Sequence, residues 1–258
     1  MHKPLVPAAL VTVLLAAGGA FFWLQRARAP RPGRVQRGYE VAQEKGCFAC
    51  HGPGGLRGMA NPGYGLDEVP PLAGGLVTMY AQDEAELREW ILDGSPRRIR
   101  DDPEQWKLRE RAIVQMPAWR TLLSPEELEA LVAYVKAVSD LETPPKDGPA
   151  DAGRRTAQRL GCFNCHGPQG RGGQPNPLAF KGHIPAWDGP DFPELARDDA
   201  EVREWILFGR PQRLQDQKAA RYFLDRQPIK MPPYQGHVSE AEIGELLAYI
   251  RWVRANPY

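Results

Sequence analysis

A seven-residue motif occurs twice in this chain of 258 residues. It reads GCFACHG at residues 46–52 and GCFNCHG at residues 161–167, so the two copies are offset by 115 residues. The same offset aligns DEAELREWILDG (83–94) with DDAEVREWILFG (198–209), without a gap and with nine of twelve positions identical. A period of this length is too long for a solenoid unit, so each copy must form its own core. The chain is therefore expected to fold as a tandem pair of homologous domains.

The segments that flank the two copies have the composition of linkers. SDLETPPKDGPAD (139–151) and QRARAPRPGR (25–34) both combine proline and glycine with charged residues. We expect both linkers to be semi-extended tethers that hold the domains apart. The predicted organisation is an N-terminal segment 1–24, a linker 25–35, a first domain 36–140, a second linker 141–151 and a second domain 152–258.

The apolar pattern of each copy is helical. Leu, Val and Ile recur at helical spacing over residues 128–138 and again over 243–253. Serine and glutamate three positions apart, at Ser124 and Ser239, predict capping boxes that begin these terminal helices. Further helices are expected over residues 37–46, 83–93 and 198–208. Because strand patterning is nearly absent, the predicted fold class is all-α.

The N-terminal segment differs from the rest of the chain. Residues 5–24 contain no charged side chain, and twenty such residues in a helix are long enough to cross a bilayer core of roughly 30 Å. A cleaved signal peptide is the alternative, since small residues at 18–20 could form a cleavage site. The apolar run continues past that site to Leu24, which favours an uncleaved transmembrane helix.

All four cysteines lie in the two motifs, as Cys47, Cys50, Cys162 and Cys165, so none remains for a separate disulfide framework. A thioredoxin-like redox pair would need a βαβ setting that the pattern lacks. A disulfide within each motif would leave His51 and His166 without a role. One zinc site made by all four thiolates would require the two domains to meet across a proline-rich linker. Covalent attachment of c-type haem uses both cysteines and the histidine, and we expect it in both copies.

A low-spin electron-transfer haem needs a second axial ligand, usually methionine or histidine. Met116 follows His51 by 65 residues, and Met231 follows His166 by the same interval. Each is followed by proline and precedes a terminal helix. We therefore predict that His51 with Met116 and His166 with Met231 bind the two irons. Met59 and Met79 have no methionine at the equivalent position of the second copy, so they cannot serve a shared role. His183 and His237 likewise have no histidine counterpart in the first copy, and we interpret them as surface residues.

This order of a short helix, C-x-x-C-H, a Gly/Pro-rich loop, a middle helix, Met-Pro and a terminal helix resembles class I cytochromes c. The chain as a whole resembles a membrane-anchored dihaem member of that family, with the likeness covering residues 36–140 and 151–256. The resemblance implies two tandem class I cytochrome c-like haem domains preceded by one transmembrane helix, with one covalently attached haem in each domain.

The resemblance also implies roles for single residues. Gly38 and Gly153 would allow the first and last helices to approach closely at Tyr134 and Tyr249. A loop proline carbonyl would accept a hydrogen bond from the iron-binding imidazole. The candidates for that carbonyl are Pro70 or Pro71 in the first copy, and Pro185 or Pro190 in the second.

Other conspicuous side chains receive less specific interpretations. Trp90 and Trp205 are expected to be core residues that cover a haem face. Trp119 and Tyr234 are candidates to contact a haem propionate. The segments 95–115 and 210–230 depart from the family pattern, and the first is interpreted as a solvated loop whose basic residues have acidic partners, with a docking face as the alternative. Its basic residues are Arg97, Arg98, Arg100, Lys107, Arg109 and Arg111.

These features predict an electron carrier and not an enzyme. Each haem iron would have two protein ligands and no open coordination position. The two haems would then pass single electrons from a membrane-associated donor, such as a quinol-oxidising complex, to a terminal acceptor. The alternatives are a dihaem peroxidase-like enzyme or a gas sensor, which need an open iron position, and a haem-bearing subunit of a larger respiratory complex. Expected partners are redox proteins or respiratory complex subunits. The formal net charge of +1 gives no reason to expect nucleic acid.

Two arguments about membrane orientation conflict. Lys3 precedes the apolar segment and four arginines follow it within residues 26–34, which by the positive-inside rule would keep the domains in the cytoplasm. Covalent haem attachment, by family resemblance, occurs on the periplasmic side in bacteria. We give the chemistry more weight and expect a single-pass protein of the bacterial cytoplasmic membrane, with residues 25–258 on the periplasmic side.

Overall fold

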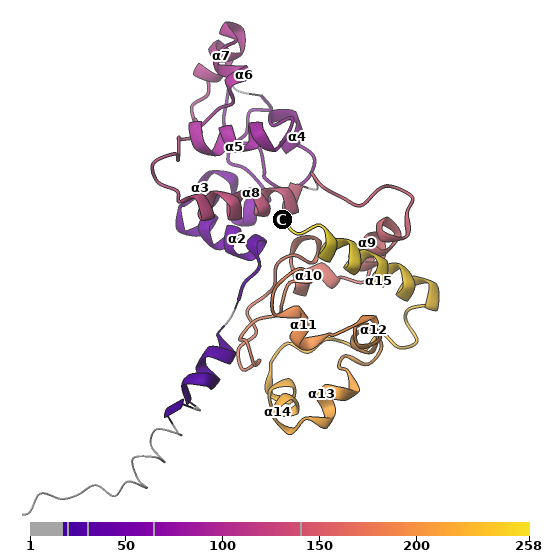
Figure 1. Ribbon diagram of the computed structural model, residues 1–258. Helices are drawn as coiled ribbons and strands as arrows, with labels where there is room; N and C mark the ends of the chain where they lie inside the picture. The colour runs from indigo at the N-terminus through magenta and orange to yellow at the C-terminus, as the bar shows by residue number, and fades with distance from the viewer. Residues whose placement is uncertain (1–17, 20, 30, 64, 140) are drawn as a thin grey trace, which may run out of the picture.

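The structure is a computed structural model that describes residues 18–19, 21–29, 31–63, 65–139 and 141–258 (Figure 1). Within these residues the regular structure is helical, and the only β-type pairings are two isolated bridges, Ala60–Glu68 and Pro175–His183. The two bridges are related by the 115-residue offset. The predicted all-α class is confirmed.

Each copy of the repeat forms its own group of helices, drawn as the upper and lower bodies in Figure 1. The first domain contains α2 (Arg34–Glu44), α3 (Phe48–His51), η1 (Pro53–Gly55), α4 (Val77–Tyr80), α5 (Glu84–Asp93), α6 (Arg97–Arg100), α7 (Pro103–Glu110) and α8 (Pro125–Ser139). The second domain contains α9 (Pro149–Arg159), α10 (Cys162–His166), η2 (Pro168–Gly170), α11 (Phe192–Leu195), α12 (Asp199–Phe208), α13 (Gln212–Asp216), α14 (Lys218–Arg226) and α15 (Glu240–Ala255).

The first and last helices of each domain pack together over much of their length, α2 on α8 and α9 on α15. A Cβ atom at Gly38 would overlap the carbonyl of Ala130 and lie 2.6 Å from Cβ of Tyr134. At Gly153 a Cβ would meet Tyr249 at 2.9 Å. The expected close approach at both glycines is confirmed, because only glycine leaves room for the facing backbone.

Local signals begin and end the helices as the sequence indicates. At Ser124 the side chain accepts from the Glu127 amide at 3.2 Å, and the Ser124 amide donates to the Glu127 carboxylate at 2.8 Å. Ser239 begins α15 with the same reciprocal pair. The middle helix α5 ends at Gly94 in the left-handed region, with φ of 71°. These caps satisfy backbone groups that a helix end would otherwise leave without partners.

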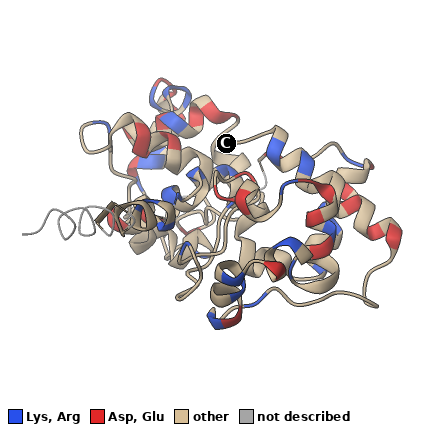
Figure 2. Ribbon diagram, turned by 60° about the horizontal axis from the view of Figure 1, so that its bottom comes forward, with Lys and Arg blue, Asp and Glu red and all other residues tan. Residues whose placement is uncertain are grey.

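The segments 95–115 and 210–230 are helical where a loop was expected, since α6, α7, α13 and α14 lie in them. The expectation of acidic partners holds for several of the basic residues. Arg98 pairs with Glu86 at 2.7 Å, and Arg213, at the same position of the second copy, pairs with Glu201 at 2.6 Å. Figure 2 shows acidic and basic residues interspersed along the ribbons of both domains.

The first linker is not a free tether. Nε of Arg31 donates to the buried carboxylate of Asp191 in the second domain at 2.6 Å, and Arg31 also pairs with Glu194. Nε of Arg28 donates to the carbonyl of Phe180 at 3.3 Å. The expectation that this linker holds the domains apart is wrong, because Arg28 and Arg31 donate hydrogen bonds to residues of the second domain.

Most of the expected transmembrane segment, residues 5–24, lies outside the described residues. Residues 18–19 and 21–28 are helical. In the part of the chain that the structure describes, no helix combines the length and the apolar character needed to span a membrane.

Candidate haem sites

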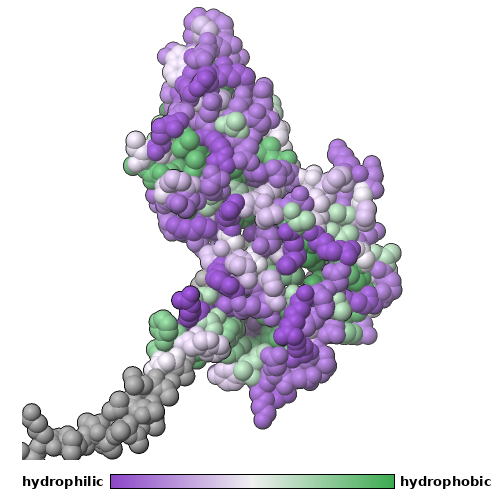
Figure 3. All heavy atoms as spheres, in the orientation of Figure 1, coloured by the Kyte–Doolittle hydropathy of each residue, from purple (hydrophilic) through white to green (hydrophobic). Residues whose placement is uncertain are grey.

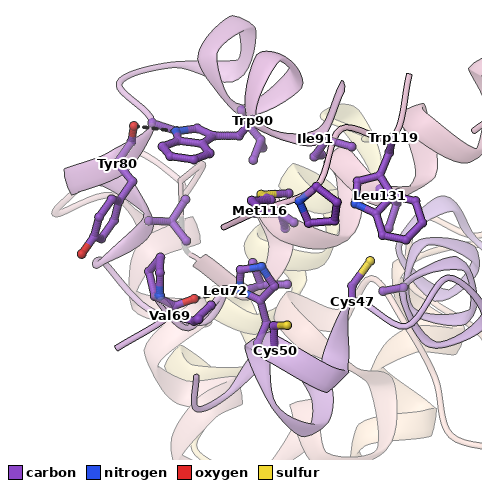
Figure 4. A pocket seen from close by; sticks show the side chains of 18 of the residues that line it. Cys47, Cys50, Val69, Leu72, Tyr80, Trp90, Ile91, Met116, Trp119 and Leu131 are labelled. Carbon is purple, nitrogen blue, oxygen red and sulfur yellow. Dashed lines mark hydrogen bonds between the residues drawn. The ribbon is translucent and has the colours of Figure 1, made fainter. Parts of the chain in front are cut away.

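A large apolar cavity occupies the centre of the first domain (Figure 4). Cys47, Cys50, His51 and Met116 all line it, together with apolar side chains of α4, α5 and α8. The empty space between the lining residues amounts to about 1360 Å³, with the solvent at its mouth included. The long Gly/Pro-rich loops therefore wrap around room for a large, mostly apolar group.

The first motif presents three side chains toward this cavity because a helical turn begins there. Cys47 lies directly before α3, and Cys50 and His51 follow it by three and four residues, the spacings that share one face of a helix. Both thiols are free and half-buried. Burial raises the pKa of the Cys47 thiol above its ordinary value, and in the second copy burial raises the pKa of Cys162 to about 11.

The imidazole of His51 is held in a defined orientation. Its Nδ1 lies 2.8 Å from the carbonyl oxygen of Pro70. A carbonyl only accepts, so Nδ1 carries the proton and Nε2 keeps its lone pair for a metal. Burial lowers the pKa of His51, and the hydrogen bond to Pro70 opposes this only in part. The ring is therefore neutral at neutral pH, which is the state that binds iron.

The second copy repeats this arrangement. Nδ1 of His166 lies 3.3 Å from the carbonyl oxygen of Pro185, and burial lowers the pKa of His166 to about 4. Of the proline candidates, the structure selects Pro70 and Pro185 over Pro71 and Pro190. The selected pair is the one related by the 115-residue offset.

Met116 enters the cavity from the side opposite Cys50 in Figure 4. Its backbone passes close to α5: a Cβ at Gly94 would overlap the Met116 carbonyl, and Gly209 stands in the same relation to Met231. The amide of Trp119 donates to the carbonyl of Ile91 at 3.2 Å. Glycine at the end of the middle helix is thus required for the methionine to reach the cavity.

Two asparagines that the sequence analysis did not single out position the methionine loops, residues 111–124 and 227–239. The side chain of Asn61 donates to the carbonyl of Val114 and accepts from its amide, both at 2.9 Å. Asn176 makes the same pair of bonds to Ile229 at 2.8 and 3.0 Å. The recurrence of asparagine at the 115-residue offset was the available signal.

The large aromatic residues are fixed by their polar atoms. Trp90 borders the cavity, and its indole N–H donates to the carbonyl of Tyr80 at 2.9 Å (Figure 4). Trp205 donates to Leu195 at the same distance. The hydroxyl of Tyr234 donates to the carbonyl of Leu160 at 3.1 Å, and its pKa is raised by burial, with smaller contributions from the thiols of the second motif. Because this hydroxyl donates its proton to a backbone carbonyl beside the motif, the structure does not support the expected contact of Tyr234 with a haem propionate.

The structure does not bring the two motifs together. Among the described residues there is no group of three or more His, Cys, Asp or Glu side chains arranged to hold a metal ion. His237 is exposed, as interpreted. His183 is not a plain surface residue, since its Nδ1 lies 3.1 Å from the Lys181 carbonyl and its Nε2 lies 3.6 Å from buried Asp191.

Comparison with known families assigns each domain separately. Residues 33–135 match the family described as cytochrome c oxidase, cbb3-type, subunit III, and residues 150–254 match the family described as cytochrome c. The chain belongs to the class I cytochromes c, with two domains in tandem. No curated protein matches the chain significantly.

Two cytochrome c domains imply two covalent c-type haems, and the residues present fit such a group. In the first domain two free thiols, a neutral imidazole with its Nε2 lone pair available and a thioether line one apolar cavity. In the second, Cys162 and Met231 pack against one apolar cluster, and the ring of half-buried His166 lies 5.2 Å from that of Trp187 in this cluster. When bound, the haem supplies an iron that changes its charge by one between the ferric and ferrous states.

Proposed function

We propose that this dihaem cytochrome c carries single electrons between a membrane-associated donor and a terminal acceptor. The cysteines of each motif would hold one haem, and its iron would be bound by His51 and Met116 in the first domain and by His166 and Met231 in the second. The observation that carries the proposal is the hydrogen bond from His51 to Pro70, which leaves Nε2 of the imidazole directed at a cavity that Met116 also lines.

Closed coordination favours electron transfer over peroxidase chemistry, which needs an open or releasable iron position and an acid–base group beside it. A methionine thioether also raises the reduction potential of haem iron, which suits transfer toward a terminal oxidant. The protein contributes a largely apolar site in which the haem would be shielded from water.

The family match of the first domain supports a respiratory setting. Because residues 33–135 match subunit III of cbb3-type cytochrome c oxidase, we favour a haem-bearing subunit that delivers electrons within a respiratory complex. The first domain also exposes apolar side chains such as Met79 (64%) and Ile113 (76%), and Figure 3 shows apolar patches on one face of this domain. Such patches are typical of surfaces that contact other proteins.

The test of the proposed chemistry is the absorption spectrum of the oxidised protein together with its haem content. Two covalent haems per chain, both low-spin and both showing the weak charge-transfer band of a thioether–ferric pair, are expected. A high-spin fraction of half or more in the untreated protein would instead favour an open iron and the peroxidase alternative.

We further propose that residues 5–24 anchor the protein in the bacterial cytoplasmic membrane, with residues 25–258 on the periplasmic side. The uncharged length of the segment and the side on which c-type haem is attached support this orientation. Protease added to spheroplasts should digest both haem domains. Complete protection of both domains while the membrane is intact would overturn the orientation.

A further inference from the structure

Arg109 is a buried cation in contact with the methionine loop of the first domain. It lies on α7, is only 8% exposed and lines the central cavity. Its Nη2 donates to the carbonyl of Gly94 at 2.9 Å and approaches the carbonyl of Met116 at 3.4 Å. Its Nη1 donates to the side chain of Gln115 at 2.9 Å, and the guanidinium lies 5.1 Å from the ring centre of Trp106.

The second domain has a neutral residue at the equivalent position. The 115-residue offset places Leu224 opposite Arg109, and Leu224 is also buried, on α14. The backbone framework repeats, since Gly209 matches Gly94 and the Asn176 bonds match those of Asn61. The partners of Arg109 do not repeat: exposed Lys230 stands at the position of Gln115, and exposed Arg221 at that of Trp106. One buried position beside the methionine loop therefore differs between the copies by a full positive charge.

We propose that Arg109 raises the reduction potential of the haem in the first domain, and that the second haem has no such contribution from Leu224. The proposal rests on the function proposed above, with Met116 as an axial ligand. A guanidinium remains protonated at any physiological pH. Ferric haem carries one positive charge more than ferrous haem, so a fixed neighbouring cation disfavours the ferric state. Burial increases the effect, because water screens a buried charge less than an exposed one.

The other cations near the sites do not supply the same effect. Lys230 directly precedes Met231, but it is exposed, so solvent screens its charge. Arg171 is fully buried in the second domain, but the carboxylate of Asp188 lies 2.8 Å from its Nη1 and offsets its charge. Arg109 differs from both in combining burial with direct contact to the carbonyl of a predicted iron ligand.

The experiment is a spectroelectrochemical titration of the full chain with both haems loaded. Arg109→Leu gives the first domain the residue of the second, and Arg109→Lys keeps the charge while removing the planar group. Arg97→Leu is the matched control, since it removes an exposed charge from the same segment. Met116→His, a change of ligand, identifies which of the two potentials belongs to the first haem.

For Arg109→Leu we expect the potential of the first haem to fall, with the ratio of reduced to oxidised haem changing about tenfold at a fixed applied potential, or ~59 mV for one electron. The second potential should stay unchanged, and Arg109→Lys and Arg97→Leu should shift the first far less. An unchanged first potential in Arg109→Leu would overturn the proposal. So would equal shifts in Arg109→Leu and Arg109→Lys, since these would reflect lost hydrogen bonds and not lost charge.

The two proposals fail in different ways. If Met116→His moves neither potential, the ligand assignment is wrong, whatever Arg109 does. If Met116→His moves one potential and Arg109→Leu moves neither, the ligand assignment stands and the role of Arg109 is refuted.

Discussion

At the scale of single residues, the sites depend on hydrogen bonds with the backbone that hold the predicted ligand side chains in place. The carbonyl of Pro70 orients His51, and Asn61 holds the loop that carries Met116. Asn61 is 3% exposed, so its loss would leave partly buried backbone groups of Val114 without their side-chain partner. Each such group costs roughly 1–3 kcal/mol. The positions of the proposed ligands His51 and Met116 therefore depend on residues outside the proposed ligand set.

Replacing one ligand should affect one haem only. Met116→Ala is expected to turn the first haem high-spin and to leave the second low-spin, because the two sites lie in separate cores. Met231→Ala should give the converse. Electron paramagnetic resonance of the oxidised variants measures both states. Loss of both low-spin signals from one substitution would point to a shared site, and retention of both would show that the sixth ligand is another residue.

At the scale of elements, the crossing of the first and last helices fixes each domain. Gly38→Ala would push a Cβ atom into the backbone of α8, so we expect a loss of about 3 kcal/mol or more in the free energy of unfolding, in the range of severe packing defects. Gly244→Ala is the control: this glycine is exposed within α15 and has nothing within 4 Å of a Cβ. Gly244→Ala should raise the free energy of unfolding by up to about 1 kcal/mol. Similar results for both variants in chemical denaturation would contradict the close-approach argument.

The ion pair between Glu201 of α12 and Arg213 of α13 should lose its stabilising effect in acid. Arg213 lowers the pKa of Glu201 to about 2, mainly through its hydrogen bonds to the carboxylate. A carboxylate with a depressed folded-state pKa stabilises the fold above its unfolded pKa of about 4.3, and this stability is lost as the pH falls from about 5 toward 2. Because the pair is partly exposed to solvent, its contribution is under about 1 kcal/mol. Glu201→Gln should flatten the decline of stability over this window. An unchanged pH profile would contradict the pairing.

The sequence predicts the parts of the fold that follow from local pattern and from the repeat. The capped terminal helices need only short-range spacing, and the close helix crossings at Gly38 and Gly153 recur at the offset of the repeat. Helices α6 and α7 were missed because charged residues give them little apolar periodicity and their position depends on tertiary contacts. The burial of Arg109 was missed for the same reason, since nothing in a basic segment indicates which side chain turns inward.

At the scale of the whole molecule, the last residue of the chain joins the two domains. The ring of Tyr258 packs against the cluster around Val35 and Tyr134 of the first domain. Two cations lie over this ring, Arg171 of the second domain at 3.9 Å and Lys136 of the first at 4.9 Å. The Tyr258 hydroxyl also donates to the carbonyl of Glu142 at 3.2 Å. These contacts and those of Arg31 hold the two haem sites in one arrangement.

Removing the Tyr258 side chain should loosen this arrangement without changing either site. We expect Tyr258→Ala to keep both absorption spectra and to broaden the distribution of distances between the two ferric haems in pulsed electron paramagnetic resonance. Tyr222→Ala, at a tyrosine 55% exposed on α14, should leave the distribution unchanged. A distribution as narrow in Tyr258→Ala as in the wild type would show that the domains are held by other contacts.

The central claim is that both haems are bound by histidine and methionine, one pair in each domain. The most direct measurement is the proton NMR spectrum of the fully reduced protein, because a methionine methyl group held over the porphyrin plane is shifted far upfield of all other methyl groups. We predict two such methyl resonances, of which Met116→Ala removes one and Met231→Ala the other. A spectrum of the wild-type protein with fewer than two, or one in which neither substitution removes a resonance, would contradict the account.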